Sequence, residues 1–221
     1  MEIATLRYPK KSHRKAITLP NESVRLAELM GIALGDGGIN NPWQLVITLN
    51  SIADLGYSRY VQSLLEGLFM IEVAIRKRKG RNALVLVSSS TSLVDFMVAK
   101  GSVRGNKVAQ KIDIPKWIEG KSLFERYFVR GLVDTDGCLY IHRHTIKGKT
   151  YRNIGFCFSS KSQPLICSVA AILKKSGIQP HVMANESTIY LYSKTAVVDY
   201  LRIFGSSNPR ITNKFKEWRG V

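Results

Sequence analysis

Two aspartates, each followed by a glycine, are the residues of this sequence best suited to catalysis. Asp36 lies in the stretch LMGIALGDG at 29–37, and Asp136 lies in VRGLVDTDG at 129–137. The two stretches repeat each other, because the aspartates and the glycines after them are 100 positions apart. In both, the spacing of the apolar residues predicts a buried helix that stops at the aspartate. The glycine that follows allows a left-handed turn and a close approach of a ligand to the backbone.

Each of these helices also has a flank without bulky side chains. Gly31 and Gly35 are four residues apart in the first helix, and Gly131 and Thr135 are four apart in the second. Small residues at this spacing let two helix backbones approach closely. If the two flanks meet on a pseudo-twofold axis, the helices end side by side and their terminal aspartates become neighbours.

Two neighbouring carboxylates at helix C-termini predict a cation site. Each carboxylate faces the negative end of a helix dipole, and the two charges repel each other. A divalent cation relieves both problems, because hard cations bind carboxylate and carbonyl oxygens together. The expected ligands are Asp36, Asp136 and the last helical carbonyls, those of Gly35 and Thr135. Asp-Gly is also a common turn dipeptide, so it is the doubled pattern that favours a phosphodiester-cleaving metal site over a pair of turns.

The charge balance points to an acidic partner. The chain has 33 Lys and Arg against 16 Asp and Glu, which gives a formal net charge of +17. Nucleic acid is the commonest partner of such a surface, with an anionic membrane or a generally basic proteome as alternatives. Three cysteines without C-x-x-C spacing indicate neither a zinc site nor disulfides, so we expect an intracellular location, in the cytoplasm or nucleoid or in an organelle matrix. No stretch is long and apolar enough to span a membrane.

The order of predicted elements occurs twice. Residues 20–99 and 122–205 each read as helix, two strands, helix, two strands, helix, and a basic linker at 100–121 joins them. We expect this linker to be ordered and docked. The opening hairpin of the first half is clipped, because only six residues separate Asp36 from Trp43. The predicted fold is α+β, a monomer built as an internal pseudo-dimer of two αββαββα halves with antiparallel sheets.

The ends of the chain and of two helices carry smaller signals. Residues 1–19 form a basic arm, which suits either contact with DNA or organellar targeting, and 206–221 form a basic tail. The sequence Ser122-Leu123-Phe124-Glu125 has the spacing of a capping box. Thr91 is a candidate cap for the third helix of the first half.

The two motifs resemble the paired signature of the LAGLIDADG homing endonucleases in their monomeric, two-motif form. GNKVAQKIDIPKWI, before the second motif, is similar to the connector of archaeal intron and intein members. The resemblance spans about residues 20–205. Leu34 replaces the first aspartate of the motif, a position that is typically structural, while Asp36 and Asp136 match the metal-binding acids of the family.

This resemblance implies saddle-shaped sheets astride double-stranded DNA and a Mg²⁺-dependent double-strand cut across the minor groove of a long, asymmetric target. Mn²⁺ or Ca²⁺ would substitute for Mg²⁺ in binding, and host intron RNA is a further candidate partner. Family members place basic or polar residues around the metals. By position these are Lys161 and Lys194, whose counterparts in the first half, Asn50 and Ser90, are not cationic. We therefore expect the two strands to be cut at unequal rates.

Strand alternation predicts which side chains face DNA, since alternate residues point to opposite faces of a sheet. Arg, Gln and Asn suit purine edges and Lys suits phosphates. A solvated sheet face is the alternative reading of the same pattern. The residues expected on the DNA face are Gln44, Thr48, Asn50, Arg76, Arg78, Tyr140, His142, His144, Tyr190, Tyr192 and Lys194.

Two other functions remain open for this sequence. An RNA maturase or a non-cleaving DNA-binding regulator would share the fold, and the presence of both acids favours the endonuclease. The nuclease core of an intein fits poorly, because the chain begins with Met1 rather than a nucleophile and ends in WRGV without a His-Asn pair.

Overall fold

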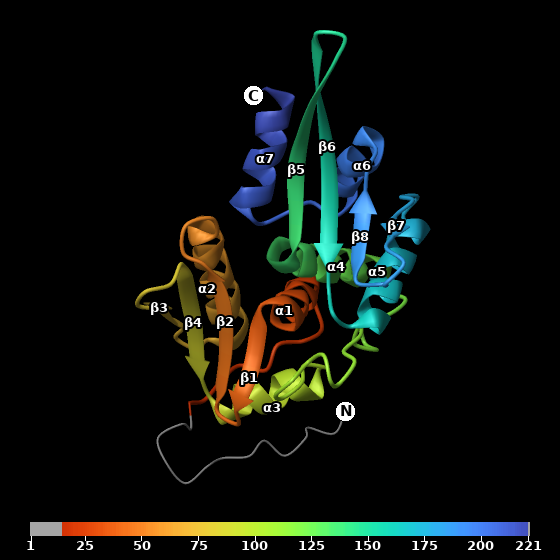
Figure 1. The fold of residues 1–221 in the computed structure, drawn as a ribbon. Helices are drawn as coiled ribbons and strands as arrows, with labels where there is room; N and C mark the ends of the chain where they lie inside the picture. Colours follow the sequence, from red (N-terminus) through yellow and green to blue (C-terminus); the bar gives the residue numbers. More distant parts are fainter. Residues whose placement is uncertain (1–14, 221) are drawn as a thin grey trace.

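The computed structural model describes residues 15–220, which form two halves of like architecture (Figure 1). Each half contains three helices and a four-stranded antiparallel sheet, and one more helix follows the second half. The first half comprises α1 Val24–Gly35, β1 Gly37–Asn41, β2 Gln44–Asn50, α2 Leu55–Phe69, β3 Ala74–Lys77, β4 Ala83–Ser89 and α3 Thr91–Ala99. The second half and the last helix comprise α4 Ser122–Asp136, β5 Gly137–Ile146, β6 Lys149–Ser159, α5 Gln163–Lys175, β7 His181–Val182, β8 Thr188–Leu191, α6 Lys194–Ile203 and α7 Pro209–Arg219.

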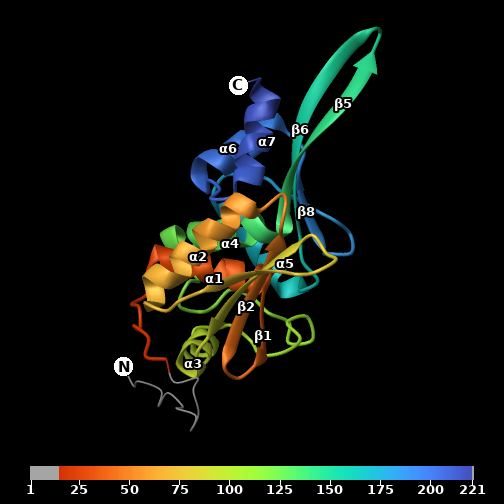
Figure 2. The same cartoon turned by 90° about the vertical axis from the view of Figure 1, so that its left-hand side faces the viewer.

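The two sheets have the same topology. Their strand orders are β1-β2-β4-β3 and β5-β6-β8-β7, so each strand of one sheet has a counterpart at the same place in the other. The element order in each half is αββαββα, and the predicted fold class is confirmed. The opening hairpins differ in length: β5 pairs with β6 from Gly137 to Ile146, whereas β1 has only five residues. Figure 2 shows the β5–β6 hairpin extending well beyond the body of the molecule.

Helices α1 and α4 pack against each other at the centre of the molecule (Figure 1). The contact is reciprocal, because Gly31 lies against the carbonyl oxygen of Phe128 and Gly131 lies against the carbonyl oxygen of Glu28. A Cβ on either glycine would collide with that oxygen. The predicted small-residue flanks therefore do meet, and they meet because no other residue allows two helix backbones to come this close. α1 is apolar around most of its circumference, as expected for a helix enclosed by protein.

One face of each sheet is buried under helices and the other is open. In the first sheet Leu45, Ile47 and Leu49 are at most 2% exposed and belong to the core. In the second sheet Phe156 and Phe158 lie on the corresponding buried face. The apolar face of each sheet thus fixes which polar side chains point the other way.

A buried ion pair crosses the α1–α4 interface. Glu28 is only 1% exposed and accepts a hydrogen bond from Nε of Arg130 at 3.1 Å. The hydroxyl of Tyr60 donates to the same carboxylate at 2.8 Å, and the Arg130 guanidinium lies over the ring of Tyr127. Burying this carboxylate is costly unless it is paired and hydrogen-bonded in this way.

The linker is ordered and docked on both halves. Ile112 and Ile118 are buried in the common core. Trp117 donates from its indole nitrogen to the carbonyl of Lys100 at 2.8 Å, and the hydroxyl of Ser162 in the second half donates to the carbonyl of Ile112. The linker therefore packs as part of the core rather than acting as a flexible tether.

Two predicted helix caps are wrong. Ser90, not Thr91, caps α3, and its hydroxyl accepts from the backbone nitrogen of Leu93 at 3.3 Å. Ser122 is the first residue of α4 rather than its cap, so it cannot close a capping box. Glu125 instead accepts from the backbone nitrogen of Gly120 at 2.7 Å.

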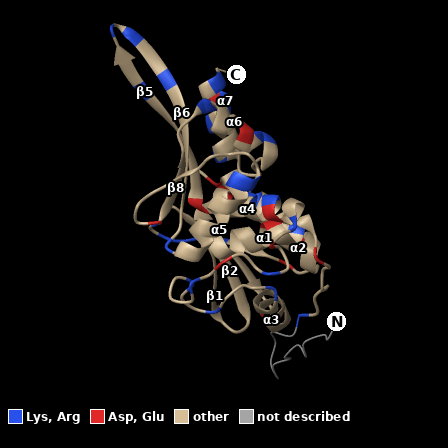
Figure 3. Cartoon of the chain, turned by 90° about the vertical axis from the view of Figure 1, so that its right-hand side faces the viewer, with Lys and Arg blue, Asp and Glu red and all other residues tan. Residues whose placement is uncertain are grey.

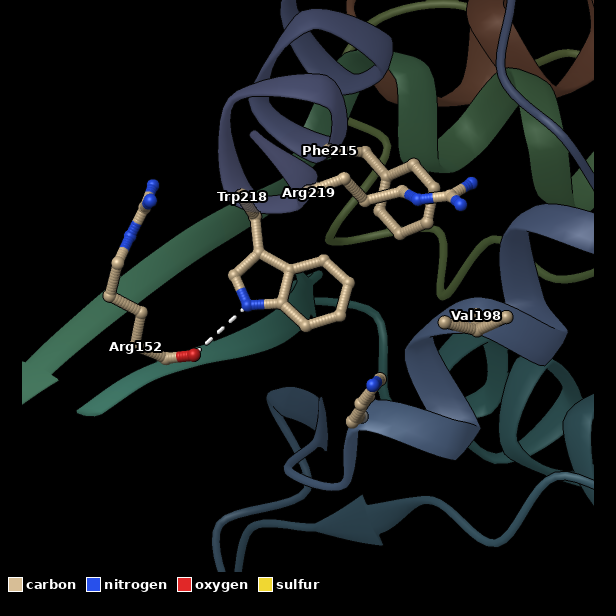
Figure 4. Close-up of a pocket in the computed structure, with 6 residues that line it drawn as sticks. Arg152, Val198, Phe215, Trp218 and Arg219 are labelled. Atoms are coloured by element: carbon tan, nitrogen blue, oxygen red, sulfur yellow. Dashed lines mark hydrogen bonds between the residues drawn. The ribbon is translucent and has the colours of Figure 1, made fainter. Parts of the chain in front are cut away.

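The segment predicted as a basic tail folds as α7, which packs on the second half. Its Trp218 donates from the indole nitrogen to the carbonyl of Arg152 in β6 at 3.0 Å (Figure 4). Asn208 starts the helix, with its side chain accepting from the backbone nitrogen of Arg210. Most of the predicted N-terminal arm lies outside the described residues. Within residues 15–220, no helix combines the length and apolarity needed to cross a bilayer.

Candidate active site at the ends of the paired helices

Asp36 and Asp136 stand where the two central helices pass directly into strands. Asp36 caps α1 and Asp136 is the last residue of α4, and β1 and β5 begin at the next residue. A Cβ on Gly37 or Gly137 would collide with the preceding helical turn, so these glycines are required for space. The expected left-handed turn is absent at Gly137, whose φ is −101°.

The close helix contact brings the two acids to one place. Gly35, the last residue of α1, lies against Thr135, and a Cβ on Gly35 would sit 3.0 Å from a carboxylate oxygen of Asp136. Asp136 thus reaches the C-terminal end of α1 beside Asp36. The glycine and threonine flanks therefore set the separation of the two acids.

Both acids hold protons more tightly than an ordinary aspartate. Loss of solvation, with the nearby charge of Asp136, raises the pKa of Asp36 to about 7. Loss of solvation likewise raises the pKa of Asp136 to about 6, although Lys107 and Arg210 act in the opposite direction. Neighbouring carboxylates with raised pKa values form a site in which a further positive charge is strongly favoured.

Lys107 of the linker supplies one positive charge at this site. Its ammonium donates to the carbonyl oxygen of Leu34 at 2.9 Å and also to that of Gly35, the last two carbonyls of α1. Lys107 is half-buried, and loss of solvation lowers the pKa of its ammonium group. The negative charges of Asp136 and Asp36 act in the opposite direction and raise that pKa. A cation at a helix C-terminus is stabilised by the helix dipole.

Arg210 supplies the second positive charge, at the end of α4. Its guanidinium donates to the carbonyl oxygens of Gly137 at 2.9 Å and Asp134 at 3.1 Å, on either side of Asp136. Its charge lowers the pKa of both Asp36 and Asp136. Each of the two central helices therefore ends against its own basic side chain.

A cavity of about 500 Å³ opens beside Asp136 and the last residues of α1. Asp136, Gly35, Lys107 and Lys161 all line it, together with Ser159 to Ser162 and Thr188. Lys161 is exposed, so the structure places it, as expected from its position after β6, at the edge of the acid site. Its proposed counterpart, Asn50, instead accepts from the backbone nitrogens of Ile52 and Ala53 and closes the turn before α2.

Lys194 does not lie with the acids, and this expectation is corrected. Strand β8 ends at Leu191 and α6 starts at Lys194, so strand alternation no longer applies to it. Its ammonium lies over the ring of Trp218, 5.5 Å from the ring centroid. It lines a separate cavity of about 480 Å³ with Val198, Phe215 and Arg219 (Figure 4).

The open face of the second sheet is rich in aromatic side chains. His142 stacks on His144, which stacks on Tyr151 at centroid distances of 5.3 and 5.4 Å. Tyr190 and Tyr192 are also stacked, 5.3 Å apart. Tyr140 lies over Gly155, its partner on the neighbouring strand, where any Cβ would collide with the ring. These residues therefore share one surface, as strand alternation predicted.

The open face of the first sheet is smaller and partly apolar. Gln44, Arg76 and Arg78 line one depression of about 340 Å³ together with Asn40, Asn41 and three valines. Thr48 is half-buried opposite Val85 on the same face. Gln44, Thr48, Arg76 and Arg78 are thus gathered on one side of the sheet, whereas the side chain of Asn50 is used in the turn before α2. Lysines and arginines recur along the β5–β6 hairpin and on α7 (Figure 3).

The donor set at the helix ends fits a hard divalent cation. Asp36 and Asp136 offer carboxylate oxygens that carry raised pKa values, and the carbonyls of Gly35 and Thr135 end the two helices beside them. The carbonyl of Gly35 accepts from Lys107, so it is shared with that ammonium. Within residues 15–220, no three His, Cys, Asp or Glu side chains cluster, so any ion here would rest on two carboxylates with backbone and solvent oxygens.

Such an arrangement defines a class: a single chain with two sheet-bearing halves, joined by two closely packed helices whose ends present paired acids. Comparisons with known proteins identify it further. Residues 123–213 match the family model of the LAGLIDADG-like domain. The chain has the fold of single-chain, two-half LAGLIDADG proteins. No curated protein sequence matches it significantly.

Solved structures with this fold align along most of the chain. I-DmoI in complex with DNA and Mn superposes with a TM-score of 0.56 at 17% identity, covering 85% of this chain and 99% of that one. The I-LtrWI LAGLIDADG homing endonuclease bound to target DNA gives 0.60 at 9% identity, with 89% of each chain covered. Full-length DUF199/WhiA from Thermatoga maritima gives 0.55 at 16% identity, covering 90% of this chain and 63% of that one.

Sequence reasoning missed both basic residues at the helix ends. Lys107 stood in the linker and Arg210 in the tail, segments expected to be connections. Gly101-Ser102 follows α3 and Gly205-Ser206 follows α6, but these pairs are 104 residues apart whereas Lys107 and Arg210 are 103 apart, so the repeat gave no alignment that marked the two basic residues.

Proposed function

We propose that this protein is a site-specific DNA endonuclease that makes a metal-dependent double-strand cut. The observation that carries the proposal is the pair of helix-end carboxylates, Asp36 and Asp136, held together by the glycine contacts of α1 and α4. They lie where both sheets begin, so a duplex crossing both open faces would pass over them. The likeness to endonucleases bound to DNA supports the proposal.

The residues of the site divide the work of phosphodiester hydrolysis. A bound divalent ion, expected to be Mg²⁺ with Mn²⁺ or Ca²⁺ as substitutes, would polarise the scissile phosphate and activate a water molecule. Asp36 and Asp136 would hold it, with the carbonyls of Gly35 and Thr135 as further ligands. Lys107 is placed to offset the negative charge that develops on the phosphate oxygens. Lys161, at the edge of the same cavity, is the second candidate for this role.

The open sheet faces would bind the duplex. Arginine and glutamine on the first sheet suit hydrogen bonds to base edges, and its valines suit thymine methyl groups. The stacked histidines and tyrosines of the second sheet offer rings and polar tips to sugars and bases. The net charge of +17 favours the phosphate backbone whatever its sequence.

The test is cleavage of a plasmid library with a randomised insert in Mg²⁺ or Mn²⁺. We expect cuts at one long, recurring site, a loss of at least about 100-fold in rate for Asp36→Asn and for Asp136→Asn, and no cleavage with a chelator. Asp199→Asn is the matched control, because this half-buried aspartate of α6 forms a local ion pair with Arg202 at 2.9 Å. Cleavage that survives in both acid variants would refute the assignment.

A non-cleaving nucleic-acid binder is the second candidate, either an RNA maturase or a DNA-binding regulator. One comparison favours this second candidate, because the WhiA protein has the same fold and is not named as an endonuclease. Tight binding of DNA or RNA by the wild-type chain, unchanged by chelator and without any cut, would select this reading.

A further inference from the structure

The segment between α6 and α7 crosses from the second half of the molecule back to the first. The side-chain amide of Asn208 donates to Oδ1 of Asp54, which precedes α2, and to the carbonyl oxygen of Asp134 in α4, both at 2.8 Å. Asn208 is fully buried and Asp54 is 7% exposed. A single buried amide thus joins the end of α4 to the other half.

The backbone and hydroxyls before Asn208 make further contacts with buried acids. Ser207 donates from its hydroxyl to Glu28 of α1 at 2.8 Å and from its backbone nitrogen to Asp134 at 2.7 Å. Ser206 donates to the other carboxylate oxygen of Asp134. Buried carboxylates are tolerated only with such partners, so the segment is fixed in place by both halves.

Arg210 completes the connection at the acid site. Nε donates to Oδ1 of Asp54 at 3.0 Å, while the two terminal nitrogens donate to carbonyls that flank Asp136. The carbonyl acceptors are those of Gly137, Asp134 and Thr135, at 2.9, 3.1 and 3.4 Å. Five donors in a rigid plane allow arginine to bind all these groups at once, which lysine cannot do.

Arg210 and Lys107 have corresponding places at the ends of α4 and α1. Lys107 donates to the terminal carbonyls of α1, and Arg210 donates to those of α4. Only Arg210 also has an ion pair with an acid from the opposite half, which is Asp54.

We propose that residues 206–210 form an interhalf clasp in which Arg210 is a positioning residue for Asp136. Through the three carbonyls it fixes the last turn of α4, and through Asp54 it fixes that turn relative to the first half. The clasp thereby sets the distance between the two acids. This inference rests on the proposed function for its catalytic readout, but the Mn²⁺ affinity of the acid pair can be measured without DNA.

The experiment compares Arg210→Gln, Arg210→Lys and Asp54→Asn with wild type in the full chain. Lys216→Gln is the matched control, since Lys216 is an exposed cation of the same helix. Three quantities are measured. They are the unfolding midpoint, the Mn²⁺ affinity by electron paramagnetic resonance without DNA, and the single-turnover rate of nicking of each strand of the site recovered from the plasmid library. Assays are run well below the unfolding midpoint of each variant.

We expect Arg210→Gln to weaken Mn²⁺ binding about 10-fold or more and to slow nicking about 100-fold, because small misplacements of catalytic groups cost this much. Arg210→Lys should recover part of the Mn²⁺ affinity and part of the nicking rate. Asp54→Asn should lower both as Arg210→Gln does, although Arg210 is still present. Lys216→Gln should change neither.

Two results would overturn the clasp. One is Mn²⁺ affinity and nicking rates in Arg210→Gln equal to those of Lys216→Gln. The other is a loss in Arg210→Gln that Arg210→Lys does not relieve and Asp54→Asn does not reproduce. If wild type never cuts DNA while Mn²⁺ affinity still follows the expected order, the proposed function fails and the clasp stands.

Discussion

Three aspartates at the ends of the central helices have raised pKa values: Asp36, Asp134 and Asp136. The charge of Asp136 acts on Asp36, while Asp134 is fully buried and its carboxylate accepts hydrogen bonds from the hydroxyl of Ser206 and the backbone nitrogen of Ser207. Loss of solvation raises the pKa of Asp134 to about 7, despite those hydrogen bonds. The site thus concentrates carboxyl groups that ionise only at a cost to the folded state.

This cost predicts how stability depends on pH in the absence of metal. The pKa values of Asp36 and Asp134 rise from 3.8 to about 7, and that of Asp136 rises to about 6. Between about pH 4 and pH 7 the folded protein therefore binds protons that the unfolded chain has released, so the free energy of unfolding falls as the pH rises. Denaturant titration with a chelator should show lower stability at pH 8 than at pH 5.

Divalent metal should reverse this trend, because it binds the ionised acids of the folded state. Adding Mg²⁺ or Mn²⁺ should raise the unfolding midpoint more at pH 8 than at pH 5. Metal-free stability that increases from pH 5 to pH 8 would contradict the expected ionisation of these acids.

At the scale of elements, the packing of α1 on α4 determines where the acids lie. The contact is set by Gly31 and Gly131, whose missing side chains admit the carbonyl of the other helix. Neither helix could shift outward by a methyl group without moving its terminal aspartate. The contact between α1 and α4 therefore determines both the packing of the helices and the positions of the two acids.

Gly131→Ala tests this coupling. Its Cβ would collide with the carbonyl oxygen of Glu28 and lie 3.0 Å from the backbone nitrogen of Ile32, so the free energy of unfolding should fall by about 3 kcal/mol. Gly38→Ala is the control, because no atom lies within 4 Å of its Cβ position, and it should cost less than about 1 kcal/mol. Equal stability of the two variants by denaturant titration would argue against a tight helix contact.

The elements, the docked linker and the paired acids were predictable from the sequence, whereas the roles of Lys107 and Arg210 were not. Apolar spacing marks α1 and α4 because both are buried, and alternation marks β2 and β8 because each has one covered face. The roles of Lys107 and Arg210 depend on where a linker and a terminal helix return in space, and local pattern carries no such information. The prediction for Lys194 was wrong for a related reason, because strand alternation does not give the direction of a side chain that lies beyond the end of the strand.

For the whole molecule, the unequal hairpins make the two open faces different in reach. The β5–β6 hairpin projects beyond the body and carries Lys147 and Lys149 at its tip, whereas β1 pairs with β2 over a short, irregular register (Figure 2). A duplex lying across both sheets would be contacted further along on the side of the second half. We therefore expect an asymmetric DNA footprint.

Replacing residues 144–151 with a two-residue turn tests this expectation. Protection from nuclease digestion should shorten on one side of the cut only. The salt dependence of affinity should weaken by about two phosphate contacts, because Lys147 and Lys149 are lost. A footprint that shortens on both sides, or an unchanged salt dependence, would rule out this placement of the hairpin.

The ion pair between Glu28 and Arg130 has one more consequence, because the repeat does not duplicate it. The positions equivalent to Arg130 and Glu28 in the opposite halves are Met30 and Phe128. Two copies of the first half would bury a carboxylate against methionine, and two copies of the second would bury a guanidinium against phenylalanine. The halves are complementary partners rather than interchangeable ones, so neither could serve as the subunit of a symmetric homodimer without a new residue at this position.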